Sequence, residues 1–321
     1  MISTALWLVV VFFGAGCIVW GAEEFAEHLA AAGRGLGAST FALALLLAGA
    51  EPEELATCLT ASARKLPAIA VGDVIGANIT ACLLALGVGA LVAPLPFGRK
   101  VFRYALLGLP LGAIGVWFAW AGVVSRAEGV ILVLLYCAYI AIIWFIEKKP
   151  PSLGEAEELG QRAAEIPRSR KGREILHVFA GVAAMIGGSM ALVEGLRQIT
   201  PAEPGQATLG LTVVGFATGF ELVVLAWSTA RRGASEASIA AVIGSYAYNM
   251  TMTLGAAALV RPLVIRQAGR LQGPFLMMLG SLVLVIVLAI PNKQMGRAAG
   301  ALLIVCYVLF IGYVLWHAHI I

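Results

Sequence analysis

Ten apolar runs of 18 to 27 residues follow one another along this chain of 321 residues. An apolar helix of about 20 residues crosses the roughly 30 Å hydrocarbon core of a bilayer. We therefore predict an all-α, polytopic membrane protein of ten transmembrane helices. The expected spans are 4–22, 37–63, 68–94, 104–124, 129–146, 175–196, 207–230, 237–260, 273–290 and 298–316.

The composition supports this class. The chain is 60% hydrophobic and 12% charged, whereas a soluble domain carries about 25% charged residues. The net charge of +4 gives no reason to expect a nucleic-acid partner. The five cysteines lie inside apolar runs without a CxxC pair, so metal or redox chemistry is not expected of them. The sequence holds no phosphate-binding loop, catalytic triad or zinc motif, so neither an enzyme nor a resident cofactor is predicted.

The basic residues predict how the chain is oriented. Of the 22 Lys and Arg residues, 15 lie in the loops after the odd-numbered spans. Because cytoplasmic loops carry the excess of Lys and Arg, these loops are expected in the cytoplasm and both termini outside. The polar segment 147–174 contributes most of this excess and reads as a cytoplasmic linker between 1–146 and 175–321.

Two acidic segments lie within the apolar runs and look like copies of each other. Residues 47–55, LAGAEPEEL, are followed by VIGAN at 74–78, and residues 214–222, VGFATGFEL, are followed by VIGSY at 242–246. A carboxylate at the centre of a span costs roughly 2.5–3.5 kcal/mol or more, so it marks an ion or proton pathway by default.

The two acidic segments occupy matching places in two halves of five spans each. Because five is odd, the second half enters the membrane from the opposite side, which predicts two inverted five-helix repeats. Gly49 and Pro52 are expected to interrupt the first acidic helix, and Gly215 and Gly219 the second. Freed carbonyls beside carboxylates form an oxygen-only ligand set, which suits Ca²⁺, Na⁺ or Mn²⁺.

The motifs also resemble the alpha-repeats of the sodium/calcium exchanger (cation/Ca²⁺ exchanger) superfamily. That family's pattern is Gly-Thr-Ser-x-Pro-Glu-Leu, followed by Gly-Asn-x-Ile-Gly-Ser-Asn-x-x-Asn. Here the first repeat, about 44–87, reads GAEPEEL and GDVIGANITA, and the second, about 210–255, is more divergent. The resemblance implies ten spans, a central cytoplasmic loop and two long helices, spans 1 and 6, that slide against the rest.

The resemblance implies a cation site at the bilayer midplane. Its acidic anchors fall on Glu54 and Glu221, which are expected to face each other. The spacing from anchor to amide position differs between the repeats: it is 28 residues from Glu221 to Asn249 and 27 from Glu54 to Ala81. A one-residue bulge in span 7 is therefore expected, and Glu53 is an alternative anchor to Glu54. Ala81 and Ala77 stand where the family has coordinating side chains. The full expected ligand set is Glu54, Glu221, Glu51, Asn249, Ser245, Thr218 and Asn78, with the carbonyls of Ala50 and Ala217.

Other polar residues are expected to play no part in this site. Asp73 is expected on the surface of its helix near the start of span 3. Glu23, Glu24 and Glu27 follow span 1 and are interpreted as a solvated helix end. The four histidines, His28, His177, His317 and His319, lie at predicted membrane edges.

These observations predict a secondary antiporter that exchanges Ca²⁺, or a related divalent cation, for Na⁺ or H⁺. Its partners are inorganic cations and the lipid bilayer, and its oligomeric state is left open. One alternative is an H⁺-coupled divalent exchanger, or a Na⁺/H⁺ exchanger without a calcium role. An alternative of another class is an ion channel or a non-transporting membrane scaffold.

Overall fold

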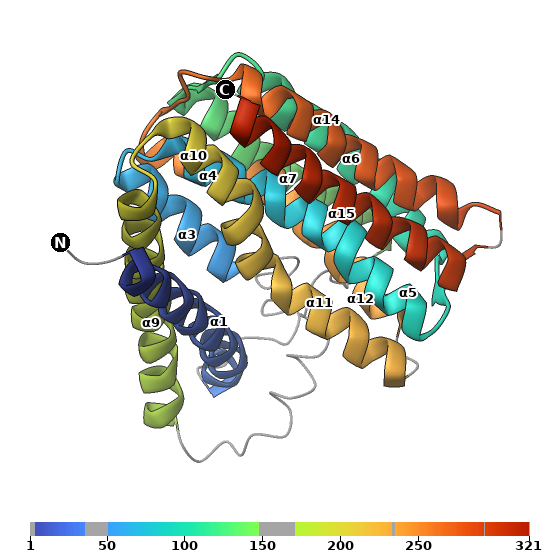
Figure 1. Ribbon diagram of the computed structural model, residues 1–321. Helices are drawn as coiled ribbons and strands as arrows, with labels where there is room; N and C mark the ends of the chain where they lie inside the picture. The colour runs from blue at the N-terminus through green and yellow to red at the C-terminus, as the bar shows by residue number, and fades with distance from the viewer. Residues whose placement is uncertain (1–3, 36–50, 148–170, 233–234, 292, 321) are drawn as a thin grey trace.

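A computed structural model describes residues 4–35, 51–147, 171–232, 235–291 and 293–320 (Figure 1). In the first half the helical segments are α1 (Thr4–Gly35), α3 (Pro52–Ala63), α4 (Pro67–Ile79), η1 (Thr80–Ala85), α5 (Leu86–Val92), α6 (Arg99–Ala119) and α7 (Arg126–Glu147). In the second they are α9 (Lys171–Ile199), α10 (Glu203–Leu209), η3 (Gly210–Val214), α11 (Gly215–Arg232), α12 (Ser235–Tyr248), η4 (Asn249–Thr253), α13 (Leu254–Val260), α14 (Gly269–Ala289) and α15 (Arg297–Ile320).

Eight helices in the described part of the chain are long and apolar enough to cross a membrane. They coincide with eight of the expected spans and make this an integral membrane protein. The second expected span includes 37–50, which lie outside the described residues, and its visible part is α3. The eighth expected span is the helical stretch 235–260, formed by α12, η4 and α13.

The helical stretch Pro67–Val92, formed by α4, η1 and α5, lies at the centre of the molecule. In its most apolar window 83% of the residues are buried, against 28% in Thr4–Phe25. It contacts α3, α11, α14 and α15, so protein rather than lipid surrounds it. A polar side chain on this stretch therefore faces other helices.

Within the described residues, three helical stretches contain a π-helical turn. These turns are η1 and η4, near the middle of the two central stretches, and η3, directly before α11. Extra-residue turns of this kind often occur at functional sites. The bulge expected in span 7 was meant to add one residue between Glu221 and Asn249, and η3 does not do so, because it ends before Glu221.

The expected interruption at Gly215 and Gly219 is wrong, because the chain stays helical from Glu203 to Arg232. These glycines instead allow helices to approach each other. A Cβ added at Gly215 would lie 2.5 Å from the carbonyl carbon of Gly76, and one added at Gly76 would lie 2.4 Å from the Leu211 oxygen. The glycines thus bring α4 against η3 and the start of α11.

The two halves make matching contacts across the molecule. Strand β1 (Leu95–Pro96) pairs with β4 (Gln294–Met295), and β2 (Val123–Val124) pairs with β3 (Leu263–Val264), both antiparallel. Each pair joins the connection that follows one central stretch, after α5 or α13, to the connection that precedes the last helix of the other half, α15 or α7. The glycine contacts follow the same rule: Gly87 of α5 meets Gly300 of α15, and Gly255 of α13 meets Gly129 of α7.

Helices α1 and α9 form a pair along one side of the molecule (Figure 1). Gly14 lies against Gly188 and Gly21 against Gly181, with an added Cβ only 2.6–2.7 Å from the opposite carbonyl oxygen in each case. Small residues at such crossings let two membrane helices come into backbone contact. The pair touches the rest of the molecule mainly through α3 and α11.

Candidate cation site

The first acidic motif forms the beginning of α3. Pro52 is its first residue, where a fixed φ favours a helix and the missing N–H is not needed. Glu51 precedes it as N-cap, and Glu53 and Glu54 follow in the first turn. All three side chains are buried, at 5%, 1% and 1% exposure. The positive end of the helix dipole faces these carboxyl groups and favours their charged form.

Asp73 of α4 belongs to the same region, so its predicted place on the helix surface is wrong. Its side chain is fully buried, and Thr218 Oγ1 donates to its Oδ1 at 2.9 Å. This hydrogen bond joins α4 to α11 where Gly76 and Gly215 bring the two helices together. Asp73 was misjudged because its position near the start of a span is an edge in sequence but lies inside the protein.

Carboxyl groups from α3, α4 and α11 form one cluster, in which Glu221 of α11 is half-buried and the others are buried. The Glu53 carboxyl group lies beside those of Glu51 and Glu221. The Glu54 carboxyl group has Asp73 and Asn249 as its neighbours. The expectation that Glu54 faces Glu221 is therefore corrected, since Glu53 does so. Both Glu53 and Glu54 belong to the cluster, so each stays a candidate anchor.

Amide and hydroxyl groups form a second part of the site. Asn249, the first residue of η4, donates from Nδ2 to Asn78 Oδ1 at 3.3 Å and to Ser245 Oγ at 3.2 Å. Thr253 Oγ1 donates to Asn249 Oδ1 at 3.3 Å. Asn78, Ser245 and Asn249 are each fully buried. The structure thus brings these three predicted residues together beside Glu54.

Several carboxylate oxygens in the cluster receive no hydrogen bond from the described residues. They are Oε1 of Glu53, both oxygens of Glu54 and Oδ2 of Asp73. The Asn249 side chain approaches Glu54 without reaching hydrogen-bond geometry. A buried carboxylate without partners is strongly disfavoured, so either a cation or a proton must accompany these groups.

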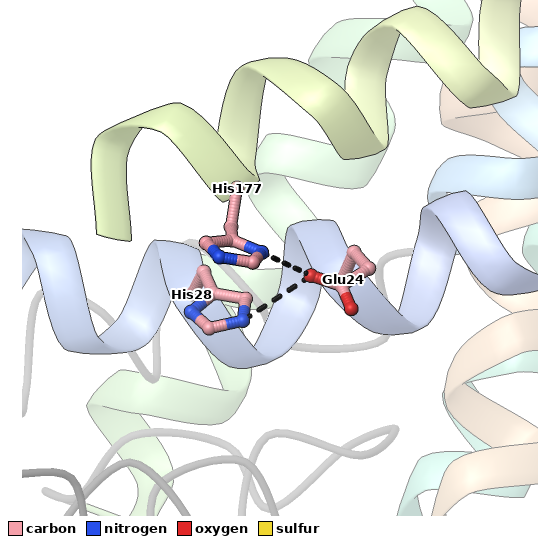
Figure 2. A group of neighbouring side chains, drawn as sticks. All are labelled: Glu24, His28 and His177. Carbon is pink, nitrogen blue, oxygen red and sulfur yellow. Dashed lines mark hydrogen bonds and ion pairs between the residues drawn. The ribbon is translucent and has the colours of Figure 1, made fainter. Parts of the chain in front are cut away.

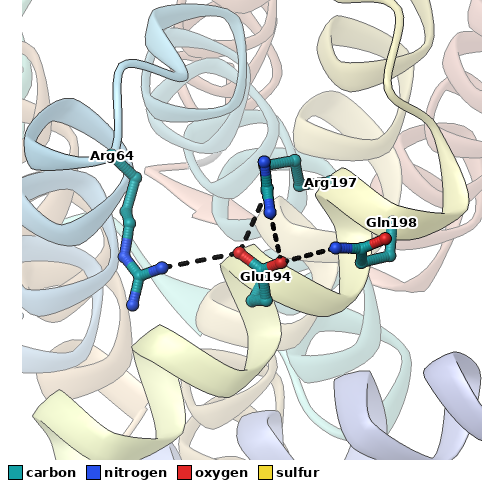
Figure 3. Close-up of polar contacts among 4 residues, drawn as sticks. All are labelled: Arg64, Glu194, Arg197 and Gln198. Carbon is teal, nitrogen blue, oxygen red and sulfur yellow. Dashed lines mark hydrogen bonds and ion pairs between the residues drawn. The ribbon is translucent and has the colours of Figure 1, made fainter.

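The nearby basic residues of α3 and α9 lie in another network. Figure 3 shows Arg64, at the end of α3, reaching Glu194 of α9 at 3.5 Å, where Arg197 and Gln198 also bind the same carboxylate. Arg64 and Arg197 are 39% and 49% exposed. This network connects α3 to α9 at the surface and leaves the charge of the buried cluster unchanged.

The two predicted carbonyl ligands are Ala50 and Ala217. Ala50 lies outside the described residues. Ala217 lies within the unbroken helix α11, and its side chain lines an apolar groove with Val11, Phe12 and Phe216. Its carbonyl is therefore not released by a broken helix as the sequence suggested.

The arrangement offers carboxylate, amide and hydroxyl oxygens in a buried space. Such an oxygen-only set matches the preference of hard cations. Sequence reasoning missed Asp73 as a member. The available signal was its place in a stretch, 67–79, whose other side chains are all apolar or small apart from Asn78.

Known proteins share both the sequence pattern and the fold. The family model "Sodium/calcium exchanger protein" matches residues 6–145 and 174–316. Inner membrane protein YrbG of Escherichia coli is 24% identical over 98% of both chains. Sodium/calcium exchanger MaX1 of Methanosarcina acetivorans is 30% identical over 133 residues, which are 40% of this chain and 38% of that protein.

Among solved structures, the sodium-calcium exchanger NCX_Mj soaked with 100 mM Na⁺ and 10 mM Sr²⁺ superposes with a TM-score of 0.62. The match covers 97% of this chain and 99% of that one at 21% identity, so it establishes the fold. The family match extends over most of the chain and both of its halves. This chain therefore belongs to the sodium/calcium exchanger protein family, a family of membrane cation transporters.

Proposed function

We propose that this protein is a secondary antiporter that moves Ca²⁺, or a related divalent cation, in exchange for Na⁺ or H⁺. The observation that carries the proposal is the buried carboxyl cluster, in which Glu54 accepts no hydrogen bond from the described residues. Moving an empty, fully charged cluster through the membrane interior is too costly. The cluster therefore changes sides only when loaded, which is what coupled exchange requires.

The proposed architecture is ten transmembrane helices in two inverted repeats, 1–146 and 175–321, joined by a linker at 147–174. The reciprocal pairing of β1 with β4 and β2 with β3 supports the repeat. Gly76 and Gly244, Gly87 and Gly255, and strands β1 and β3 all lie 168 residues apart. The bias of Lys and Arg supports a cytoplasmic linker and outward termini.

The same offset of 168 residues supports the assignment of anchors. It relates Glu221 to Glu53, and these two carboxyl groups are neighbours. In the proposed site Glu53, Glu54 and Glu221 bind the divalent cation, and Asn249 contributes its amide oxygen. Asp73 and Glu51 add negative charge, while Thr218, Ser245 and Asn78 position the ligands through their hydrogen bonds.

Alternating access is proposed to use the pair α1 and α9. These helices contact each other through backbone at Gly14, Gly21, Gly181 and Gly188, so they move as one body. Their contacts with α3 and α11 place them against the two helices that carry the acidic anchors. A shift of the pair would uncover the cluster to one side or the other.

Proton coupling is the second candidate, and one observation favours it. The carboxyl groups of Glu51 and Glu221 both lie beside that of Glu53, and Glu51 and Glu53 are buried. Adjacent carboxylates cannot all be ionised without a cation, so a shared proton is the natural state of the unloaded cluster. The positions that would add neutral ligands, Ala77 and Ala81, carry no polar side chain.

The test is calcium flux in proteoliposomes that contain the purified protein. An outward Na⁺ gradient and an outward H⁺ gradient are applied separately, and ⁴⁵Ca²⁺ uptake is measured. An antiporter shows uptake that needs a counter-ion on the far side, a channel shows uptake without one, and a scaffold shows none. Glu54→Gln is expected to abolish uptake, and Glu23→Gln, a change at an exposed residue of α1, to preserve it.

Uptake that persists undiminished in Glu54→Gln, or that continues without any counter-ion, contradicts the proposal. The ratio of uptake under the two gradients decides between Na⁺ and H⁺ coupling.

A further inference from the structure

A separate group of ligating side chains lies between α1 and α9. Glu24 and His28 are one turn apart on α1, and His177 projects toward them from α9 (Figure 2). Glu24 Oε2 lies 2.8 Å from His177 Nδ1 and 3.2 Å from His28 Nε2. One ligand atom from each residue lies within 4.8 Å of the others. The three atoms thus face a common point between the helices.

A fourth side chain fixes one of these ligands. His28 Nδ1 donates to Glu174 Oε2 of α9 at 2.5 Å, and the Glu174 side chain is only 10% exposed. A proton held on Nδ1 leaves the Nε2 lone pair directed at Glu24. A carboxylate behind a histidine in this way is the usual support of a metal-binding imidazole, because it sets the tautomer and raises the basicity of the ligand.

The two imidazoles and the Glu24 carboxylate are held close together by their helices. His28 has a carboxylate oxygen at each ring nitrogen, Glu24 at Nε2 and Glu174 at Nδ1. The rings of His28 and His177 stack with centroids 4.3 Å apart, so both present a nitrogen to the same Glu24 oxygen. Two imidazole nitrogens and one carboxylate oxygen are a ligand set that suits a transition-metal dication.

From this geometry we propose that Glu24, His28 Nε2 and His177 Nδ1 form a binding site for a transition-metal dication of the Zn²⁺ class, with Glu174 as the positioning residue of His28. Metal–ligand bonds of about 2.0–2.2 Å place tetrahedral ligand atoms about 3.3 Å apart. The two separations from Glu24 Oε2, 2.8 and 3.2 Å, need only small adjustments, and the two imidazole nitrogens lie within 4.8 Å of each other. Imidazole ligands select Zn²⁺, Co²⁺ or Ni²⁺ over Ca²⁺, which prefers oxygen.

The site has a mechanical consequence. Its ligands come from both α1 and α9, which already touch through Gly21 and Gly181 nearby. A bound metal ion links the two helices at this end and strengthens the pair. This inference uses residues outside the carboxyl cluster and stands whether or not the protein is an antiporter.

The experiment is Co²⁺ titration of the purified full-length protein, followed by visible absorption in the presence of excess Ca²⁺. The excess Ca²⁺ occupies oxygen-rich sites and leaves imidazole ligands available. We expect one Co²⁺ per chain with the intense bands of a nitrogen-containing, four-coordinate site. His28→Gln and His177→Gln should lose these bands. His317→Gln, a change at an exposed histidine of α15, should keep them.

Glu174→Gln distinguishes a positioning role from a merely structural one. Loss of such a supporting carboxylate typically weakens metal affinity by about 10–100-fold, while the number of bound ions stays at one. Size-exclusion profiles compare the folding of each variant. If His28→Gln does not fold, His177→Gln and Glu174→Gln decide the question. Co²⁺ spectra that are absent in the parent protein, or the same in the parent and His177→Gln, overturn the proposal.

Discussion

The contact between α4 and η3 makes Gly76→Ala a sharp test of how the cation site is assembled. A Cβ at residue 76 would lie 2.4 Å from the carbonyl oxygen of Leu211 and 2.9 Å from its carbonyl carbon. Ordinary carbon contacts begin near 3.5 Å, so the methyl group is about 1 Å too close. Its neighbours are backbone atoms, which cannot rotate away, and the two helices must separate.

Overpacking of this kind typically costs about 1–3 kcal/mol. The gain in helix propensity from Gly to Ala, about 1 kcal/mol, offsets part of that cost. Separation of the helices also stretches the 2.9 Å hydrogen bond from Thr218 to Asp73, which lies one turn away. We therefore expect Gly76→Ala to lower both the thermal unfolding midpoint and the affinity for Ca²⁺.

The assay is thermal unfolding in detergent, measured with and without Ca²⁺. Gly280→Ala, in α14, is the matched control, because an added Cβ there meets nothing within 4 Å. The control should be unchanged or slightly more stable. An equal midpoint for Gly76→Ala and Gly280→Ala would refute the argument that this glycine is required for close packing at the site.

Three further predictions concern the carboxyl cluster. Asp73→Asn should keep an acceptor for Thr218 but remove one charge. At an effective dielectric constant near 20, two unit charges about 4 Å apart interact with roughly 4 kcal/mol. Ca²⁺ affinity measured by calorimetry should therefore fall much further in Asp73→Asn than in Thr218→Val, and similar losses in both variants would contradict the charge argument. Glu51→Ser should leave folding intact but change how Ca²⁺ flux depends on pH or Na⁺, because Glu51 is buried beside Glu53. A flux profile like that of the parent protein at every pH and Na⁺ concentration would show that Glu51 does not belong to the cation site. Ca²⁺ should bind more weakly at pH 6 than at pH 8, because protons compete for the same carboxylate oxygens; equal affinities at the two pH values would argue against carboxylate ligation.

The sequence by itself determined the class of fold and the region of the site. Runs of about 20 apolar residues have few structural solutions in a bilayer, because every backbone hydrogen bond must form within the helix. Carboxylates inside such runs, as at Glu54 and Glu221, are costly enough to indicate function without any structure. The resemblance to the sodium/calcium exchanger superfamily was confirmed by the family match.

Only the tertiary structure decided which side chains meet. Asp73 was expected on the surface, but α4 is enclosed by other helices and Asp73 joins the cluster. The sequence could not choose between Glu53 and Glu54, and folding brings both in because the start of α3 is buried on more than one face. His28 and His177, 149 residues apart, were expected only to lie at membrane edges, and their rings are stacked. These contacts depend on how helices cross, which is set by glycines such as Gly21 and Gly181 on facing surfaces. A hydrophobic pattern fixes which segments enter the membrane, whereas neighbours across a crossing depend on the packing of two helices at once.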